Sequence, residues 1–140
     1  MQETNADSNL ILTALWTFLD GITDGDDEKV FPVVNIANRP AVATNDSFVV
    51  IDTNGPVSGR STDSGNDCIA RCVCLVQLFA RDLDAKGTLD MVKLTSMHSA
   101  LIGALPYNIA PYTFKKKNHV GRRDALGFHA TLINLDCLIY

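Results

Sequence analysis

The segment from Cys68 to Arg81 is the longest run of alternating side chains and constrains the fold more than any other feature. Successive residues of a β-strand point to opposite faces, so residues two apart share a face. One face is apolar throughout, because cysteine behaves as a small hydrophobic residue; its members are Cys68, Ala70, Cys72, Cys74, Val76 and Leu78. The pattern predicts a long central strand, residues 68–81, whose apolar face is covered by helices.

Cysteine is concentrated in this segment, since Cys68, Cys72 and Cys74 lie within seven residues of one another. On a strand, ligands two residues apart are spaced by about 7 Å in a row and do not converge on one ion. Nor does the spacing resemble the disulfide framework of a small secreted protein. We therefore predict buried structural thiols in a chain that folds in a reducing compartment, with no metal and no cofactor; a thiol or metal site is the residual alternative.

Two segments have the apolar spacing of amphipathic helices. The first covers residues 8–20, after a candidate N-cap at Asp7-Ser8, and the second covers residues 88–105 and ends before a proline. Trp16 falls beside the first apolar stripe, where core packing and a subunit contact are both open. His98 falls beside the second stripe and is predicted to be a surface or boundary residue.

The other segments complete a single domain of residues 1–140. Residues 30–52 hold two short strands, and Pro32 favours an edge position for the first of them. Residues 53–67 are rich in turn formers and predict a flexible loop that orders on assembly, without a phosphate-binding glycine motif. Residues 111–140 read as an extended hairpin. The predicted fold class is α+β, with a mixed, mostly antiparallel sheet of about four to five strands packed with two helices.

The two ends of the chain carry opposite charge. Within a net charge of -4, the C-terminal hairpin holds a basic run that we place at its tip, comprising Lys115, Lys116, Lys117, Arg122 and Arg123. The N-terminal region is acidic, and we expect its most charged loop to form an assembly face comprising Asp24, Asp26, Asp27 and Glu28. Both runs are either solvated faces or complementary surfaces of identical copies that meet head to tail.

No residue pattern in the chain is typical of an enzyme, because neither HExxH nor GxSxG nor an EF-hand ligand order is present. We therefore predict no enzymatic activity, with a cysteine-dependent enzyme as a remote third hypothesis. The first residues lack the basic and apolar regions of a signal peptide, and no apolar run reaches the roughly 18 residues that cross a bilayer. We expect no membrane partner.

The order helix, two short strands, long loop, long strand, helix, basic hairpin and last strand resembles the tail-terminator, or tail-completion, proteins of long-tailed bacteriophages. The segments that carry the resemblance are Asn9 to Asp20, Ser47 to Asp52, Cys72 to Phe79, Leu89 to Leu105 and Leu126 to Ile133. The resemblance implies a structural virion protein that forms a homohexameric ring, terminates the tail tube and joins it to the head-side connector. Its expected place is the head-proximal end of the tail, after assembly in the host cytoplasm.

The partners that this resemblance implies are further copies of the chain, the tail tube protein, the head-tail connector protein and, in the channel, non-specific contact with DNA. The alternative is a small nucleic-acid-binding or partner-binding module that uses the basic hairpin tip. A Lys/Arg cluster neutralises phosphates without reading sequence, but an overall pI of about 5.1 is unusual for a dedicated DNA-binding protein.

Overall fold

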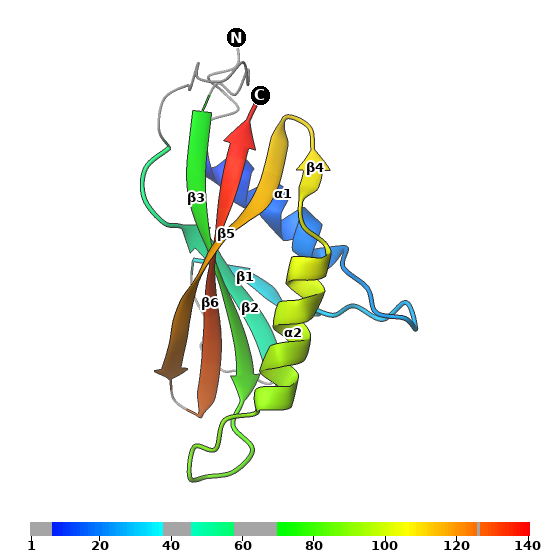
Figure 1. The fold of residues 1–140 in the computed structure, drawn as a ribbon, viewed down its shortest axis with the longest axis vertical. Helices are drawn as coiled ribbons and strands as arrows, with labels where there is room; N and C mark the ends of the chain where they lie inside the picture. The colour runs from blue at the N-terminus through cyan, green and yellow to red at the C-terminus, as the bar shows by residue number, and fades with distance from the viewer. Residues whose placement is uncertain (1–6, 38–45, 58–69, 126) are drawn as a thin grey trace.

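The computed structural model describes residues 7–37, 46–57, 70–125 and 127–140. They form two helices and one six-stranded sheet (Figure 1). The elements are α1 (Ser8–Asp20), β1 (Val34–Ile36), β2 (Ser47–Thr53), β3 (Ala70–Arg81), α2 (Met91–Gly103), β4 (Tyr107–Ile109), β5 (Tyr112–Ala125) and β6 (Phe128–Ile139). The strand order is β1-β2-β3-β6-β5-β4, and β1 with β2 is the parallel pair.

The predicted α+β class with a mixed, mostly antiparallel sheet is confirmed. The strand count was too low, because the short β4 between α2 and the hairpin was not predicted; it pairs with the first three residues of β5. The first short strand contracts to Val34–Ile36, since residues 22–30 fold back on themselves through backbone hydrogen bonds and a bridge between Thr23 and Lys29. β1 does lie at an edge of the sheet, as the nearby Pro32 suggested.

Both helices pack on the same face of the sheet, and α1 has the bounds expected from its apolar spacing. The carboxylate of Asp7 caps α1 by accepting a hydrogen bond from the backbone amide of Asn9 at 2.7 Å. α2 begins at Met91, later than predicted, because Asp90 is its N-cap and accepts from the amide of Lys93 at 3.0 Å. α1 packs mainly against β1, β2, β4 and β5, whereas α2 packs mainly against β3 and β6.

The alternation of the central strand is confirmed in the part that the structure describes. Ala70, Cys72, Cys74, Val76 and Leu78 belong to the main core beneath the helices, and Cys68 lies outside the described residues. The opposite face carries a smaller apolar cluster of Phe48, Val50, Phe79, Phe128 and Ala130, in which the rings of Phe48 and Phe79 stack with centroids 4.7 Å apart. β3 is therefore buried along the face beneath the helices, and on the opposite face it is buried at Gln77 and Phe79.

The C-terminal hairpin covers the predicted part of the chain, but its turn lies elsewhere. β5 and β6 pair from Tyr112 opposite Ile139 to Ala125 opposite Phe128, so the chain reverses after Ala125. The prediction that Lys115, Lys116, Lys117, Arg122 and Arg123 form the tip is wrong; these residues lie along β5 itself. The segment around Gly121 resembled a turn, but pairing continues through it as an irregularity in the strand. Of the predicted loop, residues 58–67 lie outside the described part of the chain.

Candidate functional site

The basic residues occupy the outer half of an edge strand. β4 pairs only with residues Tyr112 to Phe114, so within the described residues the outer edge of β5 beyond Phe114 has no neighbouring strand. All five basic side chains are exposed. Lysines and bulges on an open edge discourage uncontrolled pairing with other chains. This protection is the structural role of the run, and it leaves the cations available to a partner.

Two bulges in β5 determine on which face of the sheet each basic side chain lies. The register with β6 shifts between Lys116 and Asn118 and again between His119 and Gly121. Each bulge adds one residue to the strand, so side chains on one face are three positions apart instead of two. Lys116, His119 and Arg122 therefore follow one another on the face that α2 covers.

Lys117 and Arg123 point to the opposite face of the sheet. The Nζ atom of Lys117 lies 3.9 Å from a carboxylate oxygen of Asp136 on β6. Arg123 donates a hydrogen bond from Nη1 to the side-chain oxygen of Gln77 on β3, at 3.0 Å. The basic residues are thus divided between the two faces of the sheet. Cations at a hairpin tip would instead have pointed away from the sheet together.

On the helix-covered face the bulges create a groove between α2 and β5. It has a volume of about 370 Å³ and is called the α2–β5 groove below. Its lining residues are Met91, Leu94, Thr95 and His98 from α2, His119 and Arg122 from β5, and Thr131 from β6. None of these residues is acidic. A smaller hollow of about 230 Å³ involves the end of α2 together with Lys115 and Lys116.

Two histidines meet in this groove although 20 residues separate them in the chain. The ring centroids of His98 and His119 are 5.2 Å apart, with the planes inclined at 55°. Partial burial lowers the pKa of His98, and the positive charges of His119 and Lys116 lower it further. A proton on His98 is therefore disfavoured until an anion arrives to offset the neighbouring positive charges.

The acidic residues form a compact loop at the opposite edge of the sheet. The carboxylate of Asp24 accepts hydrogen bonds from the amides of Asp26 at 2.8 Å and Glu28 at 3.1 Å, so it closes the turn. Asp26, Asp27 and Glu28 remain exposed. Figure 1 shows this loop, in light blue, projecting on the right of the view, with the outer half of β5, in brown, on the lower left. The acidic loop and the outer half of β5 thus lie on opposite sides of the molecule in this view.

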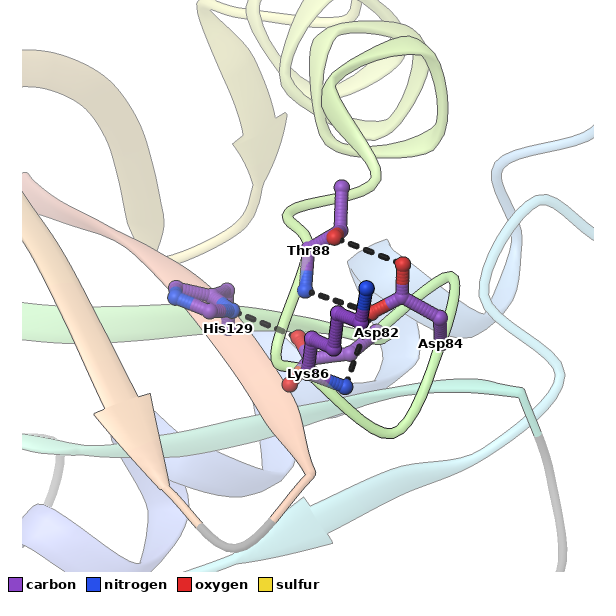
Figure 2. A network of polar contacts seen from close by, with 5 residues as sticks. All are labelled: Asp82, Asp84, Lys86, Thr88 and His129. Atoms are coloured by element: carbon purple, nitrogen blue, oxygen red, sulfur yellow. Dashed lines mark hydrogen bonds and ion pairs between the residues drawn. The ribbon is translucent and has the colours of Figure 1, made fainter.

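The third histidine belongs to a polar network at the end of the sheet (Figure 2). The Nδ1 atom of His129, at the start of β6, contacts the carboxylate of Asp82, just after β3. In the following turn Asp84 accepts hydrogen bonds from Lys86 and from the amide and hydroxyl of Thr88, and the contacts with Thr88 hold the pKa of Asp84 below its usual value. This network fixes the turn that delivers the chain to α2.

Cys72 and Cys74 of β3 are buried thiols, as predicted, and Cys137 of β6 is buried beside them. Cys72, Cys74 and Cys137 are each at most 1% exposed. A hydrogen bond with Cys72, together with burial, raises the pKa of Cys74 and leaves it unreactive as a thiolate. In the described part of the chain, no three histidine, cysteine or acidic side chains gather in a way that could hold a metal. Among the same residues, no helix is long and apolar enough to span a membrane.

Sequence reasoning missed the α2–β5 groove because it treated His98 as a lone histidine. The signal that could have revealed the groove is Gly121, since a glycine inside a strand pattern often marks a bulge. Its φ of 146° lies in the region that favours glycine.

Comparison with known proteins adds no family to this geometry: no family model matches the chain, and no curated protein is significantly similar to it.

Proposed function

We propose that this chain is a non-enzymatic structural subunit that assembles head to tail into a closed ring, and that the ring is the terminator of a bacteriophage tail tube. In this role the subunit would contact itself, the tail tube protein and the head-tail connector protein at the head-proximal end of the virion tail. The observation that carries the proposal is the placement of unlike charge at the two opposite edges of one sheet.

Opposite placement matters because of the symmetry of rings. In a head-to-tail interface, one surface of a subunit meets a different surface of the next, and repetition closes the ring when the rotation allows it. A chain with its acidic loop at the β1 edge and its cations along β5 has two unlike, complementary surfaces of this kind. Complementary charge favours this pairing and disfavours acid-to-acid or base-to-base contact.

Apolar side chains accompany the acidic surface. Trp16 is 38% exposed while its ring nitrogen donates a hydrogen bond to the carbonyl of Val34 on β1, at 3.1 Å. Ile36, two residues further along β1, is 45% exposed. Tryptophan is among the residues that contribute most to interfaces. The exposure of Trp16 and Ile36 therefore favours a subunit contact for Trp16 over a role in core packing.

A charge-reversal experiment tests the head-to-tail interface. One variant carries Asp26→Lys with Glu28→Lys, and the second carries Lys115→Glu with Lys117→Glu; Asp27 is left alone because its φ of 61° tolerates lysine poorly. Each variant alone should remain monomeric or form small species, whereas an equimolar mixture should restore a ring of about six copies. Size-exclusion chromatography with light scattering and negative-stain microscopy measure the outcome.

The mixture is the internal control. In a ring in which the two variants alternate, every loop again meets a strand of opposite charge. Variants that assemble singly as well as the unmodified chain would show that the two charged surfaces do not meet. A stable monomer that retains DNA in a salt-dependent manner would instead favour the alternative function, a small nucleic-acid-binding module. In the ring itself, the cations of β5 that the acidic loop leaves uncovered would supply the non-specific contact with DNA.

A further inference from the structure

We infer that the α2–β5 groove is a binding site for a phosphate ester of about the size of one nucleotide. The site can be tested apart from ring assembly, because the substitutions of the ring test leave its lining intact: Lys117 points to the other face of the sheet, and Lys115 is not among the groove's lining residues. The inference rests on the cavity and on the side chains that two strand bulges and one helix bring together.

The polar part of the groove matches a phosphate group. Arg122 supplies planar donors that suit phosphate oxygens, and the imidazoles of His98 and His119 add donors at the same place. The hydroxyls of Thr95 and Thr131 line the same cavity, and Lys116 is close enough to affect the charge of His98. With no acidic side chain among the described lining residues, the groove is selective for anions.

The remaining lining residues indicate what the phosphate is attached to. Met91 and Leu94 give the groove an apolar part beside the cations. Ligand sites for small molecules usually measure about 300–1,000 Å³, and the groove lies near the lower end of that range. An inorganic phosphate ion would leave the apolar part uncovered, whereas a sugar and base fill it.

Binding should be stronger in mild acid. The charged groups that face His98 are Lys116, His119 and Arg122 from β5, while β6 presents the neutral Thr131 and, beyond it, His129 in contact with Asp82. A bound phosphate offsets these positive charges, so it raises the pKa of His98 and takes up a proton. By linkage, affinity then rises as the pH falls through the range in which His98 takes up its proton.

Isothermal titration calorimetry on the full chain tests the site with three probes: inorganic phosphate, thymidine monophosphate and a single-stranded thymidine oligonucleotide. Thymidine monophosphate should bind with one site per chain, and more tightly at about pH 6 than at about pH 8. Arg122→Gln should weaken this binding at least tenfold, about 1.4 kcal/mol. Lys117→Gln, which removes a cation from the opposite face of the same strand, should change it less than twofold. Replacing both His98 and His119 by asparagine should remove the gain in affinity at the lower pH and leave only the titration of the phosphate itself, whose second pKa is about 6.

If both the oligonucleotide and thymidine monophosphate bind tightly, and Arg122→Gln weakens both, the natural ligand is a nucleic acid strand. If only thymidine monophosphate binds, the natural ligand is a free phosphate ester. Equal losses in Arg122→Gln and Lys117→Gln would overturn the inference, because they would show only general electrostatic attraction. The inference would also be overturned if none of the three probes released or absorbed heat on titration. A peptide of residues 23–29 that binds where thymidine monophosphate does not would also overturn it and assign the groove to carboxylates.

Discussion

β3 and β5 are the two long strands on either side of β6, with 12 and 14 residues, yet they behave differently. β3 pairs with β2 and with β6 without a single shift in register. β5 shifts twice against the same neighbour. One strand is the buried centre of the fold, and the other is its exposed, charged edge.

The difference arises from what surrounds each strand. A one-residue slip in β3 would turn every core side chain to the wrong face, so burial of the face beneath the helices enforces strict alternation. Beyond Phe114, β5 has within the described residues a neighbour on one edge only, and its side chains reach solvent. Extra residues can be accommodated there at little cost. Core strands therefore keep their pattern, while edge strands are free to acquire binding geometry.

The largest expected loss of stability comes from truncating a buried side chain in the central strand. Leu78 is fully buried on β3, and Leu78→Ala should lower the free energy of unfolding by about 2–5 kcal/mol, since it leaves a cavity beneath the helices. Val120→Ala is the counterpart on β5, where the side chain is 50% exposed, and it should change stability by less than about 0.5 kcal/mol. Urea denaturation measures both. Similar losses in the two variants would remove the contrast between the strands.

A smaller effect is expected from the glycine in the second bulge. Gly121→Ala has space for the added methyl group but places it on a backbone with φ of 146°, and it should cost about 1–3 kcal/mol. Gly103→Ala, at the end of α2, also has open space and no such strain, so it should be neutral or stabilise by up to about 1 kcal/mol. Thermal unfolding compares them. A neutral Gly121→Ala would show that the bulge does not require glycine.

The smallest expected effect is a pH dependence of stability that originates at the groove. The folded-state pKa of His98 lies below its ordinary value of 6.5, so the unfolded chain binds more protons in mild acid. The free energy of unfolding should therefore fall as the pH decreases through about 6.5, and the loss is complete once the pH is below the folded-state pKa. His98→Gln should flatten the profile measured by denaturation between about pH 5 and 8. A profile as steep as that of the unmodified chain would exclude His98 as its source.

The helices, the central strand and its covered face could be predicted because burial imposes a period. The apolar spacing of Ile11, Leu15 and Phe18 reports a helix packed on a core, and that of Cys72, Cys74 and Val76 reports a strand. β4 could not be predicted, because three residues are too few to show a period. The basic run was correctly found but wrongly placed, since the charges carry no information about where the pairing ends.

The sequence by itself determined the α+β class, the buried thiols of β3 and the separation of acidic from basic residues along the chain. Only the tertiary structure decided that the cations lie along an open edge strand, that they divide between two faces, and that His98 meets His119 and Arg122. The physical reason is that apolar character and charge are properties of each residue type and can be read from the sequence. A register shift, by contrast, depends on which strand pairs on each side, and long-range pairing alone settles that.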